Sequence, residues 1–206
     1  MSVANESWPF EWGRSPFRMK GIAYRSFVQF LEADVPGGLD GVAARLSSDA
    51  LRRFLRQPFL AASWYDAAPS VPLNEAAADL LGRDVGELMR ERGRIQAEED
   101  LAGVYSWLLK VASPRAVATR LPRLTARYFD WGGVEIEEES PEHVVAVRTG
   151  VPRYLAVWYD RVATPFLAYA LERAGARELR MTTSTRLDAP AHGVRCCALA
   201  FDMRWR

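Results

Sequence analysis

The chain has 206 residues, 49% of them hydrophobic, which is enough to build the core of a single domain. Its 27 basic and 26 acidic residues leave a formal net charge of +1, so no bulk electrostatic field draws the protein to nucleic acid or to an anionic membrane. We find no apolar run of about 18 residues that could span a bilayer, and no signal peptide, so we expect a cytoplasmic protein.

The first 18 residues are unusually aromatic and show neither a helical nor a strand period. Trp8, Phe10, Trp12 and Phe17 belong to this segment. Aromatic side chains at this density usually dock against a surface. That surface can be the chain's own domain, a second copy of the chain or a partner, and the sequence leaves these alternatives open. We expect an N-terminal arm at residues 1–18 and one domain at residues 19–206.

Helical periodicity dominates the N-terminal half of the chain. Apolar residues recur every three or four positions, and the segments end at turn-forming residues such as Gly82. Ser48, Asp84 and Ser113 each precede such a segment and are well placed to cap a helix. A mainly apolar stretch at residues 59–65 leads into a loop. We expect helices at residues 21–33, 39–46, 49–54, 72–81, 85–94 and 95–111, and a further helix that begins at Pro114.

The period changes from helical to alternating near residue 134. Residues 134–137 alternate apolar and acidic side chains, and residues 139–142 favour a turn. Val145 and Val147 continue into a second strand, which should pair antiparallel with the first because the connection is short. A helix at residues 152–174 and strands at 178–187 and 194–205 complete a β-β-α-β-β order.

This order of elements predicts an α+β fold, in which the helical N-terminal half packs on a four-stranded antiparallel sheet. Cys197 should be buried with the helix-facing residues of its strand. The adjacent Cys196 and Cys197 should point to opposite faces, so an ordinary disulfide between them is not expected. The sheet face toward the helices is expected to carry Val145, Val147, Leu199, Phe201 and Met203.

Residue types that carry catalysis or bind metals are few and scattered. His143 and His192 are the two histidines, and neither has metal-ligand spacing to another histidine or cysteine. Acidic runs at residues 98–100 and 135–139 are typical of solvated surfaces, and no Gly-x-Ser-x-Gly elbow occurs. We therefore expect no enzymatic activity, no catalytic residue, no metal site and no cofactor.

Three stretches of the chain resemble a known family. They are MKGIAYRSFVQFLE at 19–32, WYDAAPSVPLNEAAADLLGRDVGELMRERG at 64–93, and SPRAVATRLPRLTARYF at 113–129 followed by the strand pair at 134–148. Together they resemble a divergent H-NOX domain, the haem fold of nitric-oxide and oxygen sensors. The sequence is even more similar to an uncharacterised haem-less family that is best populated in myxobacteria. Vinyl-reductase-type domains and TRAPP trafficking subunits share the same general fold, so the fold alone does not define the function.

The two haem-binding motifs of H-NOX domains are both altered in this chain. The resemblance implies an iron-binding histidine after a Leu-x-x-Leu run, and the matching run here is Leu121-Pro122-Arg123-Leu124-Thr125. Threonine is not a useful iron ligand. The Tyr-x-Ser-x-Arg set that holds the haem propionates should lie near the second strand, where only Arg148 offers a loose match. The resemblance thus implies a haem-less domain, and a haem-binding gas sensor is the weaker interpretation.

The leading hypothesis is a non-enzymatic sensor or binding module in signalling, which holds a small apolar ligand or a protein partner. If a pocket takes the place of the haem site, aromatic and apolar side chains should line it. The candidate pocket residues are Trp64, Tyr65, Trp107, Leu121, Leu124, Thr125, Tyr128 and Trp158.

The alternative hypothesis is an assembly adaptor that resembles TRAPP subunits and acts through its outer surface. It would bind a protein partner or form a homodimer, whereas no motif supports binding of nucleic acid. Arginines on the helix after Ser113 could dock onto an acidic partner or pair with acidic neighbours on the chain's own surface, and both interpretations stay open. The candidate partner-binding residues are Trp8, Phe10, Trp12, Arg120, Arg123 and Arg127.

Overall fold

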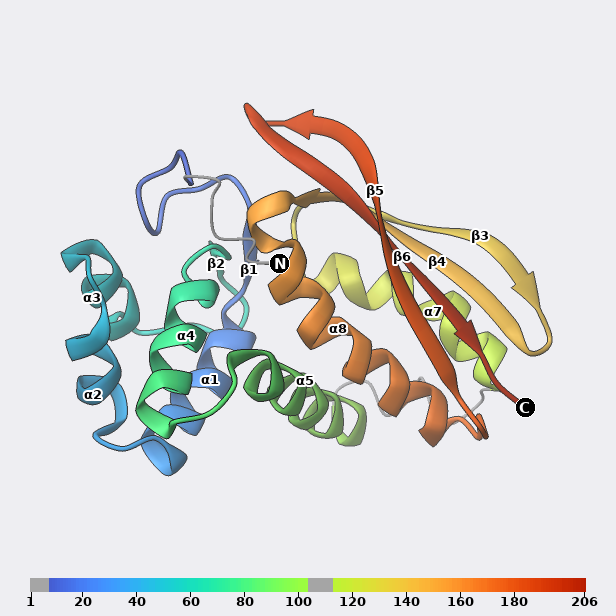
Figure 1. Ribbon diagram of the computed structural model, residues 1–206, viewed down its shortest axis with the longest axis horizontal. Coiled ribbons are helices and arrows are strands. Elements are labelled where there is room, and N and C mark those ends of the chain that lie inside the picture. The colour runs from blue at the N-terminus through green and yellow to red at the C-terminus, as the bar shows by residue number, and fades with distance from the viewer. Residues whose placement is uncertain (1–7, 104–112) are drawn as a thin grey trace.

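The C-terminal half of the protein contains a four-stranded antiparallel sheet with strand order β3-β4-β6-β5 (Figure 1). Helix α8 (Arg153–Arg173) connects β4 to β5. This β-β-α-β-β order confirms the predicted α+β class. The strands are β3 (Val134–Ser140), β4 (His143–Pro152), β5 (Arg180–Ala191) and β6 (Val194–Arg204).

The N-terminal half is helical, as predicted. This computed structural model describes residues 8–103 and 113–206, apart from the side chains of residues 121–124. The expected helix at 95–111 therefore lies partly outside the described residues. The helices before the sheet are α1 (Gly21–Asp34), α2 (Gly38–Arg45), α3 (Asp49–Arg56), α4 (Ser70–Leu81), α5 (Val85–Ala102) and α7 (Pro114–Tyr128).

The predicted helix caps are confirmed by their hydrogen bonds. The side chain of Ser48 accepts from the backbone N–H of Ala50 at 3.2 Å. Asp84 accepts from Glu87 N–H at 2.8 Å, and Ser113 caps α7 in the same way. At the other end of α4, Gly82 has a φ of 62°, a left-handed conformation that glycine adopts without steric cost and that ends the helix.

Helix α5 is continuous where the sequence predicted two helices that meet between Arg94 and Ile95. Nothing at that junction breaks the backbone, and Gly93 remains within the helix because its missing side chain allows close contact with α8. Helix α4 also begins earlier than predicted, at Ser70. Pro72 falls in its first turn, where the missing N–H costs no hydrogen bond.

A two-stranded sheet near the N-terminus was not predicted. Strand β1 (Arg18–Lys20) pairs antiparallel with β2 (Trp64–Asp66), and Met19 lies opposite Tyr65. Both strands have three residues, which is too short to show an alternating pattern in the sequence. Met19 also forms an isolated bridge with Phe129 and so joins β1 to the end of α7.

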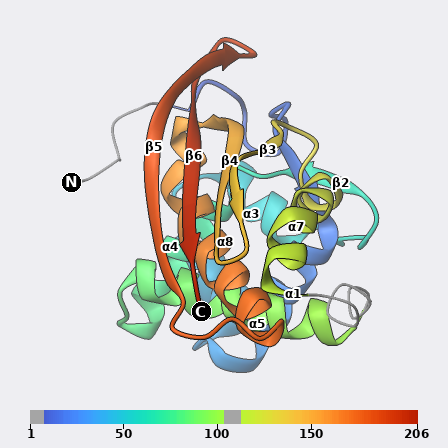
Figure 2. The same ribbon diagram turned by 90° about the vertical axis from the view of Figure 1, so that its right-hand side faces the viewer.

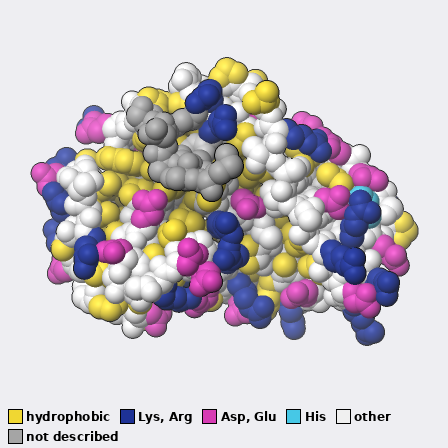
Figure 3. All heavy atoms as spheres, in the orientation of Figure 1, with side chains coloured by type: hydrophobic (Ala, Val, Ile, Leu, Met, Phe, Trp, Pro, Cys, Tyr) yellow, Lys and Arg dark blue, Asp and Glu magenta, His cyan; other side chains and the backbone are white. Residues whose placement is uncertain are grey.

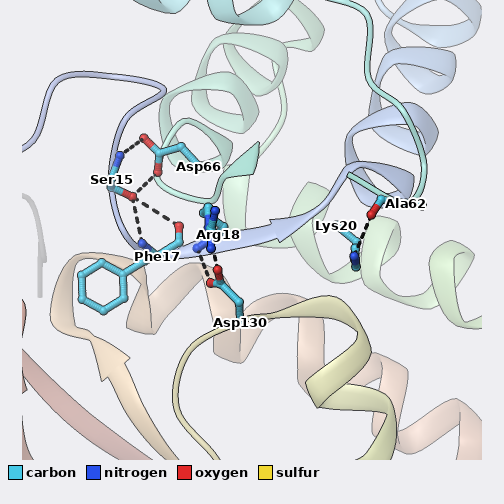
Figure 4. Close-up of polar contacts among 7 residues, drawn as sticks. All are labelled: Ser15, Phe17, Arg18, Lys20, Ala62, Asp66 and Asp130. Carbon is cyan, nitrogen blue, oxygen red and sulfur yellow. Dashed lines mark hydrogen bonds and ion pairs between the residues drawn. The ribbon is translucent and has the colours of Figure 1, made fainter. Parts of the chain in front are cut away.

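Residues 8–18, the described part of the expected arm, pack on the rest of the chain, and Figure 4 shows some of the contacts. The carboxylate of Asp66 accepts hydrogen bonds from the backbone N–H and the hydroxyl of Ser15, as Figure 4 shows. It also accepts one from the backbone N–H of Gly13. Phe17 is 1% exposed, and Arg18 pairs with Asp130 at 2.6 Å. These contacts fix the chain where it enters β1.

Helices α7 and α8 lie on one face of the sheet, and the remaining helices pack beyond α8 (Figure 2). The face toward the helices carries Val144 and Ala146 of β4, which lie opposite Met203 and Phe201 of β6. The prediction that Val145 and Val147 share this face is wrong. Strand residues alternate between faces, and these two valines form a separate cluster with Ala198 and Ala200 on the other side.

The remaining strand predictions differ from the structure mainly at the turns. The last hairpin extends past the expected loop, and its two connecting residues, His192 and Gly193, have φ values of 50° and 77°. Cys196 and Cys197 are both buried and free. Cys197 belongs to the core with Leu199, as predicted. Within the described residues, no helix is long and apolar enough to cross a membrane.

Candidate functional site

A pocket of about 190 Å³ lies where the helices meet the inner face of the sheet. Helices α1, α5, α7 and α8 and strands β4 and β6 all contribute to its wall, so it joins both halves of the molecule. The wall is mainly apolar. Its large side chains include Phe27, Phe129, Trp158, Phe166, Phe201 and Met203.

Three of the predicted pocket residues, Thr125, Tyr128 and Trp158, line this pocket. Trp64 and Tyr65 lie elsewhere. The Lys20 ammonium sits 3.8 Å above the ring of Trp64, and the Tyr65 hydroxyl accepts a hydrogen bond from the Leu60 backbone at 2.8 Å. Both residues therefore belong to the small β1–β2 sheet and its surroundings. Trp107 and the side chains of Leu121 and Leu124 lie outside the described residues.

Arg148 is a pocket residue that the sequence analysis did not place there. Only 2% of it is exposed, and its guanidinium donates a hydrogen bond to the carbonyl oxygen of Trp131. The ring centroids of Trp131, Tyr159 and Phe129 lie 4.8, 5.6 and 5.7 Å from its Cζ atom. Its Nε finds no hydrogen-bond partner in the part of the chain that the structure describes. The guanidinium is thus held by the Trp131 carbonyl, by a hydrogen bond with Tyr159 and by the surrounding rings, and its Nε donor is left unused.

The described residues of the pocket wall provide no counter-charge for Arg148. Burial lowers the pKa of Arg148, but the residue stays protonated because the ordinary pKa of arginine lies above about 12. No acidic side chain is found among the described residues that line the pocket. Burying an unpaired charge is costly, so this arrangement requires a compensating interaction.

The signal that would have found Arg148 is the alternation of β4. Arg148 has the same parity as Val144 and Ala146, and the three residues lie opposite Leu199, Met203 and Phe201. Placing Val145 and Val147 on the helix side put Arg148 on the outer face by the same rule. Successive strand residues point to opposite faces of the sheet, so assigning one residue to the wrong face assigns every other residue of that strand to the wrong face as well.

Other polar groups of the pocket wall have partners. The hydroxyl of Tyr24 donates to the Asp66 carbonyl oxygen at 2.6 Å, and the side chain of Asn74 donates to the Ser70 carbonyl oxygen at 2.7 Å. Burial raises the pKa of Tyr159, and the nearby charge of Arg148 and a hydrogen bond with Thr125 lower it by less. Tyr159 is therefore a neutral phenol beside the Arg148 guanidinium.

Arg92 and Asp100 mark the α5 side of the site. Arg92 donates to the hydroxyl and carbonyl oxygens of Ser26 at 2.8 and 3.1 Å. Burial lowers the pKa of Arg92, and the negative charge of Glu99 offsets part of this effect. Burial raises the pKa of Asp100, which accepts a hydrogen bond from the hydroxyl of Tyr128. Unlike Arg148, Arg92 therefore has both hydrogen-bond and charge partners.

The predicted partner-binding residues lie in two separate places. Trp8 packs against Phe10 and Tyr154, with ring centroids 5.3 and 5.0 Å apart, and Trp12 also contacts Tyr154. Arg120 is half-buried and Arg127 exposed on α7. The side chain of Arg123 lies outside the described residues. Basic and acidic side chains are mixed over the face shown in Figure 3.

The residues of the pocket do not fit a haem held by a histidine. The chain has two histidines, and both lie elsewhere. His143 contacts Asp202 at 3.1 Å on the outer side of the sheet, and the ring of His192 packs on Phe17. Among the described residues, no group of three or more His, Cys, Asp or Glu side chains could hold a metal ion.

The comparisons with known proteins identify the fold. No protein-family model matches the chain, and no curated protein matches it. The solved structure of an Fe(II) unliganded H-NOX protein from K. algicida matches with 10% identity and a TM-score of 0.60, covering 91% of this chain and 98% of that one. An oxygen-binding H-NOX domain related to soluble guanylate cyclases matches with 10% identity and a TM-score of 0.60, over 91% and 95% of the two chains.

A variant of the H-NOX protein from S. oneidensis matches with 14% identity and a TM-score of 0.58, over 90% and 96% of the two chains. Identities this low show the fold alone. The protein therefore has an H-NOX-like fold, which confirms the resemblance predicted from its sequence.

Proposed function

We propose that this protein is a non-enzymatic sensor or binding module of the cytoplasm, which holds one small, mainly apolar ligand and no haem. The observation that carries this proposal is the pocket of about 190 Å³ between the helices and the sheet. Aromatic and aliphatic walls with a few placed polar groups are typical of small-molecule sites. The free, buried Cys196 and Cys197 agree with a reducing compartment.

The position of the pocket supports a sensor role. A ligand there would touch α1, α5, α7, α8 and the sheet at once. Gly93 of α5 lies so close to Val162 of α8 that a Cβ on it would be 2.4 Å from the Val162 carbonyl oxygen. A ligand that favours one packing of these helices over another shifts the balance between them, and the shift can be read by a partner.

The chemistry of the wall supports binding rather than catalysis. The described residues of the wall contribute phenols, amides, hydroxyls and two arginines, but no carboxylate, imidazole or thiol. A general base or nucleophile of the usual kind would have to come from those groups. The same wall supports the haem-less proposal, since neither His143 nor His192 reaches it. Mixing the purified protein with haemin should give no Soret band of a bound haem.

The arm favours this function over an assembly adaptor. Trp8 and Trp12 pack on Tyr154 of α8, and Phe10 packs on Phe17 within the arm, so the described arm is already engaged. A signalling partner, or a second copy of the chain, would then bind the outer surface. Size measurement of the purified protein, alone and with a saturating ligand, would detect an assembly that depends on the pocket.

A cavity-filling variant tests the proposed function. Ala163 of α8 lines the pocket, whereas Val157 of the same helix is 42% exposed and does not. We expect toluene to raise the melting temperature of the natural protein and of Val157→Phe, because it binds the folded state. It should not raise that of Ala163→Phe, because the phenyl ring of the new side chain fills the pocket. Mass spectrometry of ligands retained by the natural protein should identify the physiological one. Absence of any toluene effect on the natural protein would refute the proposal.

A further inference from the structure

We propose that the ligand is a small monocarboxylate with one aromatic ring or a short aliphatic chain, and that its carboxylate pairs with the guanidinium of Arg148. This inference rests on the proposed function, because it names the chemistry of the ligand for the same pocket. The observation behind it is the buried guanidinium with an unused Nε donor at the pocket wall.

The first step is the missing acceptor. Arginine carries five N–H donors, and the Nη2 atom of Arg148 already donates to the Trp131 carbonyl oxygen. Nε has no partner among the described residues. A carboxylate matches the planar fork of a guanidinium and makes charge-assisted bonds that are stronger than neutral ones. A ligand carboxylate would therefore satisfy the donor that the protein leaves open.

The second step is the charge. Arg148 and Arg92 are the charged side chains of the described wall. Arg92 has Ser26 as its acceptor and Glu99 nearby, so Arg148 is the cation that lacks a counter-charge among the described residues of the wall. A ligand with a single negative charge would neutralise the single positive charge of Arg148 in these apolar surroundings. A doubly charged phosphate would exceed it, so the site favours a monoanion.

The third step is the size and character of the remaining space. An apolar cavity of about 150 Å³ in another protein holds benzene. The present pocket of about 190 Å³ has room for one ring, or a chain of a few carbons, together with a carboxylate. Trp158, Phe166 and Phe201 would contact the apolar part. The ring or chain then enters a space that suits it while the charge reaches Arg148.

The rings around Arg148 make the pairing specific. Trp131, Phe129 and Tyr159 lie within 5.7 Å of the guanidinium carbon and limit its movement. A guanidinium that is already fixed loses little freedom when a ligand binds. The low dielectric of the surroundings strengthens the ion pair once water is displaced. A neutral ligand of the same shape gains none of this.

The test compares ligands that differ in charge but not in shape. Benzoate and nitrobenzene are nearly isosteric, toluene reports on the apolar space alone, and hexanoate replaces the ring by a chain. Isothermal titration of the natural protein should give benzoate or hexanoate an affinity about 10-fold to 100-fold above that of nitrobenzene, as expected for a charge-assisted hydrogen bond. The stronger of the two acids distinguishes an aromatic from an aliphatic ligand.

Two variants assign the effect to Arg148. Arg148→Met removes a buried charge but keeps length and apolar contacts, so the fold should persist. It should lose at least about tenfold in affinity for the acid and keep its affinity for toluene. Arg186→Met is the control, since Arg186 lies in the same sheet, pairs with Glu137 at 2.6 Å and does not line the pocket. It should change the affinity for the acid less than about threefold.

A spectroscopic readout keeps the test independent of variant stability. In nitrogen-15 NMR spectra of the natural protein, the Nε–H signal of Arg148 should shift when benzoate is added and should not shift with toluene. If toluene binds but benzoate binds no better than nitrobenzene, the carboxylate assignment is wrong while the pocket function stands. Equal losses in Arg148→Met and Arg186→Met would also overturn the assignment. If none of the ligands binds, the proposed function itself fails.

Discussion

Asp66 accepts hydrogen bonds from both the backbone and the hydroxyl of Ser15, a residue 51 positions earlier in the chain, and both residues are buried. The same carboxylate accepts from Gly13 at 2.9 Å and from Ala68 at 2.9 Å. One side chain therefore satisfies donors from residues 13–15 and from the turn that precedes α4. A buried backbone N–H without an acceptor is costly, so this carboxylate connects the arm to the domain.

Replacing Asp66 should release the arm. We expect Asp66→Ala to lower the free energy of unfolding by about 3 kcal/mol or more, because several buried donors lose their acceptor. Ser15→Ala, which removes one hydroxyl, should cost about 1 kcal/mol. Urea unfolding followed by tryptophan fluorescence measures both. Asp79→Ala is the control, since Asp79 forms an exposed ion pair with Arg45 and should change stability by less than about 1 kcal/mol. Equal effects of Asp66→Ala and Asp79→Ala would contradict this account.

Helices and strands with a repeated apolar spacing could be predicted from the sequence. Elements that depend on contacts with residues far away in the chain could not. Helices such as α1 and the β3–β4 pair follow from repeated apolar spacing and from turn residues. The β1–β2 sheet has no such signal, because its three-residue strands are stabilised by contacts like that of Ser15 with Asp66. Local pattern cannot report an interaction across 51 residues.

Gly93 should be required for the contact between α5 and α8. A Cβ at this position would lie 2.4 Å from the carbonyl oxygen and 2.9 Å from the Cα of Val162, and these backbone atoms cannot move aside easily. We expect Gly93→Ala to cost about 1–3 kcal/mol in the free energy of unfolding, as for other overpacked contacts. Thermal and urea unfolding give this value.

Gly86 of the same helix provides the comparison. Its added Cβ would meet only side-chain atoms, at 3.1 Å or more, so Gly86→Ala should lie between no change and a gain of about 1 kcal/mol from helix propensity. A loss in Gly86→Ala as large as that in Gly93→Ala would mean that chain flexibility rather than packing explains the result.

Asp100 should make stability depend on pH. Burial raises its pKa, so between its unfolded and folded pKa values the folded protein binds more protons than the unfolded chain. This contribution to stability falls as the pH rises through that window. Asp100→Asn removes it, so the stability of the natural protein relative to the variant should decline as the pH rises above about 4, the unfolded pKa of an aspartate. Urea unfolding at several pH values gives this difference.

Asp202 should show the opposite sign. Its hydrogen bond with Arg204, the largest effect, lowers the pKa of Asp202. The ionised form is therefore favoured in the folded protein, and this contribution is lost as the pH falls toward the folded pKa. Asp202→Asn should lose most relative to the natural protein at neutral pH and least in acid. The same direction of change in both variants would show that a group other than these carboxylates controls the pH dependence.

The candidate site could be predicted only in part, because its residues come from helices and strands far apart in the sequence and because the face of one strand was assigned wrongly. Thr125, Tyr128 and Trp158 follow from the helical stripes and line the pocket. Trp64 has the same aromatic character but faces Lys20 at the edge of a small sheet. Arg148 was missed because the sequence analysis assigned the wrong set of alternating β4 residues to the face that contacts the helices. Residue type indicates what can line a pocket, but the strand register decides which residues do.

A pair of leucines tests the assignment of the sheet faces. Leu199 of β6 is 2% exposed and packs in the main core, whereas Leu187 of β5 is 91% exposed although it lies opposite the buried Cys197. Alternation alone would place both on the inner face, but the helices cover only Leu199. Leu199→Ala should therefore cost about 2–5 kcal/mol in the free energy of unfolding, and Leu187→Ala less than about 0.5 kcal/mol. The two substitutions delete the same atoms from neighbouring strands, so a difference between their urea midpoints reports burial directly. Comparable losses would mean that the end of the last hairpin is covered in solution, for example by a second copy of the chain.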